Sequence, residues 1–393
     1  MVQRFDPTLV FDTLRRTVES DSYRIGLNYS PNLNNTFLVS AISQDLDDQT
    51  TLFGNQVDAN SEGKQYEVQY IYRSNSINLV TGLERLHLDT TTLLTIPFFG
   101  SLPPSKDSLQ QNIAHLYLTL PRTWGQATLG VDYVDLDEKN TFAKHQYNPK
   151  FGLLLNATDS TLLRLAAFKT LRAEVLDNQS LIPTEIAGFN QVYDDYLSTE
   201  AKRYAIGIDH SFVTGLDGGF EFSRRDITTI PDTFTMIEEE QDELGQKAYL
   251  YWQINNRFKL SGEYIYEKFE RDFIDGMNEP DRPAVLDTKS LSISGSYFHP
   301  SGFFTDLKAT HVSQDIEEVL FTTGTSKDSD SFMITDATLG YRLPKRYGLV
   351  KLEVKNIFDK SFNFQSTFPG TGTPASSPYY PERSLFLNAQ FWF

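Results

Sequence analysis

The last ten residues of the chain read SLFLNAQFWF (384–393), and their apolar side chains recur at every second position. One face of this segment is apolar and carries Leu385, Leu387, Ala389, Phe391 and Phe393. The opposite face is mostly polar and carries Ser384, Phe386, Asn388, Gln390 and Trp392. A period of two residues places alternate side chains on opposite faces of an extended chain. The segment therefore predicts a β-strand with one apolar face.

The same alternation recurs along almost the whole chain. We find about 17 such segments between Tyr23 and Phe393, and a weaker one near residues 8–18. Tight connections follow every second segment, at residues 30–34, 73–76, 121–125, 156–160, 213–218, 253–257, 298–302 and 343–347. Long polar connections lie between them, near residues 44–62, 88–111, 136–146, 172–197, 226–245, 271–287, 314–330 and 367–382.

This strict alternation of short and long connections has no reason to occur in a soluble β-sandwich. An outer-membrane barrel has short periplasmic turns, longer outer loops, and strands whose apolar side chains face lipid. The pattern therefore predicts an all-β, transmembrane, antiparallel up-and-down β-barrel of about 16–18 strands. We expect residues 23–393 to form the barrel and residues 1–22 to be an N-terminal segment that includes a possible first strand.

Composition excludes several other classes of protein. The 393 residues include 29 Phe and 20 Tyr but no cysteine, so disulfides and thiolate metal sites are excluded. No apolar run reaches the 18 residues of a transmembrane helix. The first residues, MVQRFDPTLV, contain no apolar signal-peptide region, which we expect from a processed or truncated chain. A net charge of −17 argues against nucleic acid as a partner.

We recognise no catalytic or cofactor-binding motif in the sequence. We therefore predict that the protein is not an enzyme and has no cofactor and no metal site. The six histidines show no metal-ligand spacing, and His115 is expected to be a solvated residue of the barrel interior. Asp209 and His210 are adjacent, but neighbours on a strand point to opposite faces and cannot form a dyad. An integral outer-membrane enzyme would need a convergent Ser/His/Asp cluster.

Three polar stretches are interpreted as outer loops. The acidic run IEEEQDEL (237–244) could gather Ca²⁺, but it lacks calcium-loop spacing, and a solvated loop is the favoured interpretation. The stretch YDDYLSTE (193–200) receives the same interpretation. STFPGTGTPASSPYY (366–380) predicts the final outer loop, with Phe368, Tyr379 and Tyr380 as surface aromatics.

The C-terminal strand resembles the assembly signal of bacterial outer-membrane proteins. The matching residues are Leu385, Leu387, Phe391 and Phe393, whereas Asn388 stands where that signal has a small residue. The resemblance implies recognition by the barrel-assembly machinery and a periplasmic C-terminus. It also implies outer-membrane lipid and lipopolysaccharide as the surroundings of the barrel.

A second resemblance is to TonB-dependent receptors. Residues 334–362 resemble the penultimate hairpin of that family, which closes on Asn-Leu-Phe-Asp-Lys; here the residues are Asn356, Ile357, Phe358, Asp359 and Lys360. Residues 147–176 resemble its mid-barrel hairpin, with Leu171-Arg172-Ala173 in place of a Phe-Arg-Ala-Pro segment. The family also has an N-terminal plug, which is not recognisable in this sequence, and a 22-strand barrel.

The resemblance implies passage of a solute across the outer membrane. An energy-coupling periplasmic protein would be a partner if a plug exists elsewhere. Residues 181–195 also resemble outer-membrane proteins that carry tetratricopeptide repeats before a receptor-like barrel, which implies export or assembly of an envelope component as the alternative. Because antiparallel closure needs an even strand count, we expect the C-terminal strand to pair with residues 8–18 or the chain to lack an N-terminal set of strands.

Overall fold

The computed structural model describes residues 15–52, 54–139, 141–192, 195–230, 238–272, 283–319, 325–365, 379–380 and 382–392. In this part of the chain no helix has the length and apolar character needed to cross a membrane.

Within the described ranges, one antiparallel sheet of 18 strands makes up most of the molecule. β5 has only two residues, so 17 longer strands form the wall, as the alternation predicted. The strands of the sheet are β1 (Arg15–Asn32), β2 (Asn35–Leu52), β3 (Asn55–Arg73), β4 (Asn78–Ile96), β5 (Gly100–Ser101), β6 (Ser105–Arg122), β7 (Gly125–Glu138), β8 (Phe142–Thr158), β9 (Thr161–Leu171), β12 (Glu200–Val213), β13 (Leu216–Thr229), β14 (Glu239–Gln253), β15 (Phe258–Arg271), β16 (Pro283–Phe298), β17 (Phe303–Val319), β18 (Thr325–Arg342), β19 (Gly348–Lys355) and β20 (Ser384–Phe391).

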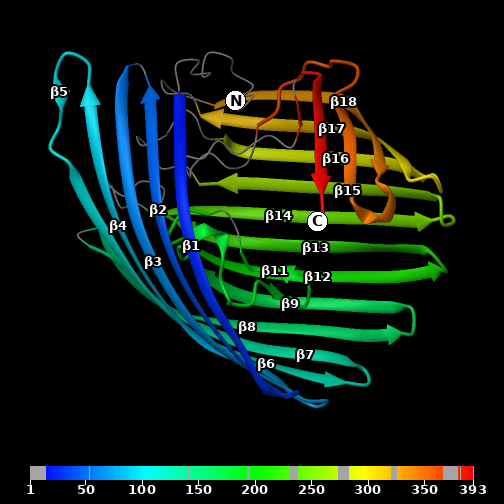
Figure 1. The fold of residues 1–393 in the computed structure, drawn as a ribbon, viewed down its shortest axis with the longest axis horizontal. Coiled ribbons are helices and arrows are strands. Elements are labelled where there is room, and N and C mark those ends of the chain that lie inside the picture. Colours follow the sequence, from blue (N-terminus) through cyan, green and yellow to red (C-terminus); the bar gives the residue numbers. More distant parts are fainter. Residues whose placement is uncertain are drawn as a thin grey trace.

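Short elements lie in the connections. β10 (Glu185–Ile186) and β11 (Phe189–Asn190) pair as a separate hairpin. The 3-10 helices are η2 (Leu176–Asn178) and η3 (Pro344–Arg346). The sheet itself is strongly curved, and β1–β4 run at a steep angle to β12–β18 in the view of Figure 1.

The two edges of the sheet are β1 and β20. β1 pairs with β2, β20 pairs with β19, and no pairing joins β1 to β20 among the described residues. Of the two expected alternatives, pairing of the C-terminal strand with residues 8–18 or a missing N-terminal set of strands, the first is not found for the described residues 15–18. They belong to β1, which begins at Arg15 rather than at Tyr23, and they pair with residues 48–51 of β2. Residues 8–14 lie outside the described part of the chain.

The predicted tight connections are confirmed, but the opposite end of the wall differs from the prediction. Tight turns join β1 to β2, β6 to β7, β8 to β9 and β12 to β13, and slightly longer ones complete that end. At the other end, the connections at 53–54 and 139–141 are just as short as these turns, so short and long connections do not alternate strictly. Polar residues such as those of 44–52 continue the strands at this end. Polar side chains on both faces of a strand do not prevent its backbone from pairing with the neighbouring strands.

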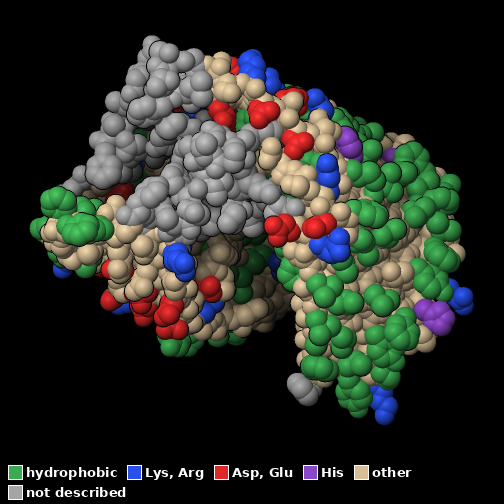
Figure 2. All heavy atoms as spheres, turned by 90° about the horizontal axis from the view of Figure 1, so that it is seen from above, with side chains coloured by type: hydrophobic (Ala, Val, Ile, Leu, Met, Phe, Trp, Pro, Cys, Tyr) green, Lys and Arg blue, Asp and Glu red, His purple; other side chains and the backbone are tan. Residues whose placement is uncertain are grey.

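An apolar band follows the outer face of the wall, as predicted. Tyr23, Ile25 and Leu27 of β1 are 72%, 75% and 63% exposed. Outward apolar side chains continue across the sheet, with Val68, Leu83, Leu129, Ile206, Leu250, Ile293, Leu307, Leu339, Leu352 and Leu387 as examples. Figure 2 shows hydrophobic side chains covering a broad area of one outer flank. The outer face of the described wall is therefore largely apolar.

The motif that carries the receptor resemblance forms the turn after β19. Asn356 is 1% exposed and has a positive φ of 49°. Its side chain accepts a hydrogen bond from the Lys360 N–H (2.9 Å) and donates one to the Lys360 carbonyl (2.9 Å) and one to the Tyr380 carbonyl (3.1 Å). Asp359 accepts a hydrogen bond from the Arg383 N–H just before β20. The motif thus ends β19 and fixes the path toward β20.

Candidate functional site

Opposite faces of the wall have opposite chemistry, which β3 shows most clearly. Tyr66 and Val68 point outward and are 54% and 52% exposed. Gln65, Glu67 and Gln69 alternate with them, point inward, and are 0%, 2% and 5% exposed. Polar side chains on the inner face are therefore not solvated here, because another part of the chain covers them.

Residues 172–192, which we call the inner segment, provide that cover. They connect β9 to β12 and were predicted to belong to a long outer connection; that position is wrong. Leu176, Ile186 and Phe189 of the inner segment are only 3%, 1% and 1% exposed. Apolar side chains recur within this otherwise polar stretch, and they pack against the inner face of the wall.

Glutamines of the wall hold the backbone of the inner segment. Gln111 accepts a hydrogen bond from the Glu174 N–H (2.8 Å) and donates one to the Glu174 carbonyl (3.0 Å). Gln65 accepts from the Leu176 N–H (3.0 Å) and donates to the Gln179 carbonyl (3.1 Å). Each carboxamide therefore satisfies one backbone donor and one backbone acceptor, as a neighbouring strand would.

The same arrangement occurs at a second place on the inner face. Residues 356–365, which we call the return segment, follow β19. Gln314 of β17 is 0% exposed, accepts from the Gln365 N–H (2.7 Å) and donates to the Gln365 carbonyl (2.9 Å). Phe362 and Phe364 pack against Phe332 of β18. Two segments of the chain are thus attached to the inner wall by the same kind of contact.

Arginines hold the far end of the inner segment. The guanidinium groups of Arg164 and Arg203 lie 4.8 Å and 5.8 Å from the centroid of the Phe189 ring. Arg203 also donates to the Asn190 carbonyl (2.9 Å). Because Gln65 lies on β3 and Arg203 on β12, the inner segment crosses a large part of the inner wall. Its contacts tie together strands that are far apart in the sheet.

Apolar contacts give the inner segment most of its docking energy. Leu176 packs on Ile42, Leu86 and Leu109, and the β10–β11 hairpin packs on Tyr117 and Phe168. Burying an aliphatic or aromatic side chain is worth about 1.5–3 kcal/mol, so Leu176, Ile186 and Phe189 together contribute roughly 5–9 kcal/mol as an upper estimate. The conformational entropy of ordering the backbone opposes docking, and hydrogen bonds with Gln65, Gln111 and Arg203 add to the apolar contacts. The inner segment is therefore a resident element of the interior.

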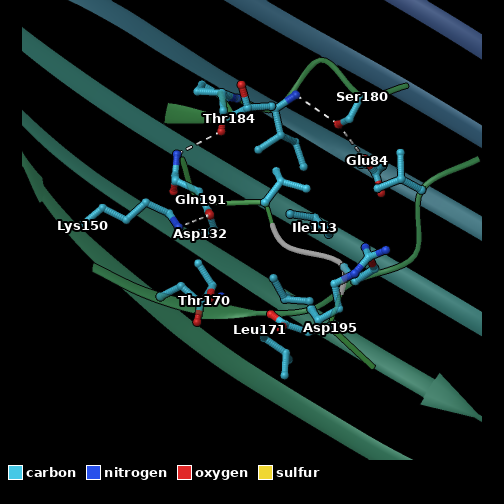
Figure 3. A pocket seen from close by; sticks show the side chains of 18 residues that line it. Glu84, Ile113, Asp132, Lys150, Thr170, Leu171, Ser180, Thr184, Gln191 and Asp195 are labelled. Atoms are coloured by element: carbon cyan, nitrogen blue, oxygen red, sulfur yellow. Dashed lines mark hydrogen bonds and ion pairs between the residues drawn. The ribbon is translucent and has the colours of Figure 1, made fainter. Parts of the chain in front are cut away.

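A cavity of about 120 Å³ remains between the inner segment and the wall. Figure 3 shows Glu84, Asp132 and Lys150 of the wall opposite Ser180, Thr184 and Gln191 of the inner segment. The Lys150 ammonium lies 2.9 Å from an Asp132 carboxylate oxygen, to which Tyr117 also donates a hydrogen bond (3.1 Å). The second oxygen of Asp132 has no hydrogen-bond partner among the described residues. A cavity of this size has room for a few water molecules that could satisfy it.

The structure confirms the predicted faces of His115 and His210 but corrects the predicted environment of His115. His115 points inward but is 4% exposed beside Gln69 and Tyr117, so the expected solvated environment is wrong. Asp209 contacts Arg164 (2.7 Å) and His210 contacts Thr161 (2.8 Å), so the two adjacent residues do point apart.

The acidic and aromatic stretches are more ordered than the sequence suggested. Residues 239–244 belong to β14, where Glu239 is 5% exposed and contacts Arg271 (3.4 Å) rather than lying in a solvated loop. Asp195 contacts Arg225 of β13. Tyr379 packs on Phe364 with ring centroids 5.0 Å apart, and Tyr380 is 41% exposed, whereas Phe368 lies outside the described residues. No group of three or more His, Cys, Asp or Glu residues is arranged to hold a metal ion in the described ranges.

Three residues of the predicted assembly signal lie on β20, which is an edge strand of the described sheet. Leu385, Leu387 and Phe391 of β20 point outward and are 68%, 75% and 54% exposed, and Phe393 lies outside the described residues. The wall glutamines, in contrast, were missed by sequence reasoning. The sequence feature that could have identified them is an uncharged amide at an inward position of a strand, between outward residues that are apolar.

No protein-family model matches the chain, and no curated protein matches it in sequence. Solved structures match its fold. They include the unliganded ferric citrate transporter FecA (TM-score 0.70, 13% identity), which aligns over 96% of this chain and 62% of its own. The chain has a TonB-dependent-receptor-like barrel fold.

Two more structures support this receptor-like fold. The copper transporter OprC has a TM-score of 0.68 at 13% identity, over 97% of this chain and 66% of its own. The siderophore receptor PiuA from Acinetobacter baumannii has a TM-score of 0.66 at 13% identity, over 96% and 64%. The receptor-like barrel thus spans less than two thirds of each of these chains. Their names are those of transporters and receptors rather than enzymes.

Proposed function

We propose that the chain is an outer-membrane β-barrel through which a solute crosses the bacterial outer membrane. The observation that carries this proposal is the opposite chemistry of the two faces of the wall. Outward side chains form an apolar band that suits lipid, and inward side chains are mainly polar. The likeness of fold to a ferric citrate transporter and a copper transporter supports transport as the function.

The orientation and partners follow from the same proposal. The tight turns are periplasmic, the other end of the wall faces outward, and the C-terminus of β20 lies in the periplasm. Leu385, Leu387, Phe391 and Phe393 then serve as the signal read by the barrel-assembly machinery. Lipid and lipopolysaccharide surround the apolar band. A periplasmic energy-coupling protein acts on the barrel if a plug is present in the whole protein.

The proposal is tested with the chain refolded in liposomes, where swelling in solutions of graded sugars measures passage. Ser294 of β16 points inward and contacts Ser261 (2.7 Å), whereas the neighbouring Ile293 points outward and is 58% exposed. Ser294→Trp should slow swelling because its bulk enters the interior. Ile293→Trp, the matched control, should leave swelling unchanged because its bulk enters lipid.

The outcomes separate the possible functions. Swelling that Ser294→Trp slows and Ile293→Trp does not supports passage through the interior. A folded, heat-modifiable protein that gives no swelling contradicts passive passage and favours the export or assembly alternative. Equal effects of the two variants would show that the assigned inward and outward faces are wrong.

A further inference from the structure

We propose that the inner segment is a fixed constriction that sets the largest solute able to pass through the barrel. This inference rests on the proposed function and adds the element that determines its size limit. It begins from the position of the segment, which crosses the interior from β3 to β12 and covers polar residues that would otherwise line a water-filled space.

The wall beneath the inner segment is built to be covered. Its inward residues include Ile42, Leu86 and Leu109, which are 3%, 1% and 5% exposed. Such residues have no favourable role on the wall of a water-filled passage, because removing the cover would expose them to water. The wall therefore matches a permanently docked segment rather than one that leaves whenever a solute passes.

Contacts with the wall, rather than secondary structure of its own, hold the inner segment in place. The inner segment contains only one 3-10 turn and a hairpin of two-residue strands. Gln65 and Gln111 contact its backbone on one side, and Arg203 contacts its backbone on the other. A segment with little structure of its own is thereby kept in one place across the interior.

The remaining passage lies between the free face of the inner segment and the uncovered wall. The free face is polar, since Asp177, Asn178, Glu185 and Asn190 are exposed. Near the tight turns, inward residues of β15–β17 are also polar, with Ser261 bonded to Ser294 and Ser296 bonded to Asp306. Nearer the other end of these strands, Phe269, Leu286 and Ile316 form a buried apolar cluster. A passage with these two sides suits small polar solutes, and its width is set by how far the inner segment extends from the wall.

The test releases the inner segment without altering the wall. In the inner segment, Leu176 and Phe189 face the wall, whereas Asn178 and Asn190 are exposed on the free face. The release variant Leu176→Glu with Phe189→Glu places one charge in each of the two buried contacts, under Leu176 and under the β10–β11 hairpin. The matched control Asn178→Asp with Asn190→Asp adds the same charge on the free face. Heat modifiability on a gel confirms that each barrel is folded.

Docking is measured separately from passage. The chain has no native cysteine, so Ile42→Cys gives a single thiol beneath Leu176, and Ser301→Cys in an exposed turn gives a positive control. A water-soluble maleimide should label the residue-42 thiol slowly in the otherwise wild-type chain and in the matched control. The release variant should label about tenfold faster or more, since each factor of ten needs only 1.4 kcal/mol of lost docking energy.

Passage is then measured by liposome swelling in sugars of increasing size. We expect the release variant to admit larger sugars than the wild-type chain, and the matched control to keep the wild-type limit. Fast labelling of the residue-42 thiol in the wild-type background would overturn the proposal, because the segment would not be resident. An unchanged size limit despite fast labelling in the release variant would also overturn it, because the segment would not be the constriction. Labelling could follow the expected pattern while neither the wild-type chain nor the release variant passes any sugar. That result would contradict the proposed passage of solutes but support the docking of the inner segment.

Discussion

Replacing Gln111 by leucine tests how much one wall amide contributes to the interior. The Gln111 carboxamide accepts a hydrogen bond from the Glu174 N–H (2.8 Å) and donates to the Glu174 carbonyl (3.0 Å) and to Glu84 (2.6 Å). Leucine keeps the volume and removes all three contacts. Gln111 is 0% exposed, so water cannot replace them without rearrangement.

The magnitude follows from the partners that are left behind. A buried polar group that loses its hydrogen bond costs about 1–3 kcal/mol. The Glu174 N–H and the Glu84 oxygen are the two groups that depend most on Gln111, so Gln111→Leu should lower the free energy of unfolding by about 2–6 kcal/mol. Gln110 is the matched control, because it is the preceding residue of β6 and is exposed on the opposite face. Gln110→Leu should change the unfolding free energy by no more than about 0.5 kcal/mol.

Urea unfolding of the chain in lipid vesicles, followed by tryptophan fluorescence, measures both variants. Hydrogen exchange at the Glu174 amide gives a local readout, and its protection should fall in Gln111→Leu alone. Equal unfolding free energies and equal Glu174 exchange in the two variants would refute the conclusion that the amide holds the inner segment.

Three other predictions concern the wall and its surroundings. Leu352→Arg places a charge on the outward face and should lower the free energy of unfolding by about 2–4 kcal/mol in lipid near the midplane. Lys351→Gln, on the inward face, should lower it far less. Equal losses in urea titrations of the two refolded variants would contradict the face assignment. Protease added to intact cells should cut between β13 and β14 or between β15 and β16 and spare residues 299–302 and 343–347, and the reverse pattern would invert the proposed orientation. Cysteines replacing Leu27 of β1 and Leu387 of β20 should form no disulfide, since the described strands do not pair; a disulfide on a non-reducing gel would show that the two edges meet.

The wall could be predicted from the sequence because its signal is local. Tyr23, Ile25 and Leu27 alternate with polar residues, and this period fixes both strand and face without any knowledge of neighbours. The tight turns were equally visible. Strand ends were not, because the polar residues of 44–52 pair with β1 and β3 and nothing in their own pattern separates a polar strand from a loop.

The inner segment could not be predicted because its position depends on contacts distant in sequence. Gln65 lies 111 residues before Leu176, whose N–H it accepts, and such a pair leaves no periodic signal. The apolar residues Leu176, Ile186 and Phe189 were the one visible sign that this connection does not remain in water. His115 was placed on the correct face, but its burial depends on the same distant segment.

The lengths of the strands have a consequence for how the protein meets its surroundings. β1 and β2 have 18 residues each, and at about 3.3 Å per residue such strands are about 60 Å long. Allowing for a tilt of about 40°, they rise about 45 Å, while the lipid-facing band of such barrels is only about 25 Å tall. In the proposed orientation, the wall therefore projects well beyond the membrane as a stiff hydrogen-bonded collar. Groups on that collar are held in place before a ligand arrives, so binding there would cost less conformational entropy than binding to mobile loops.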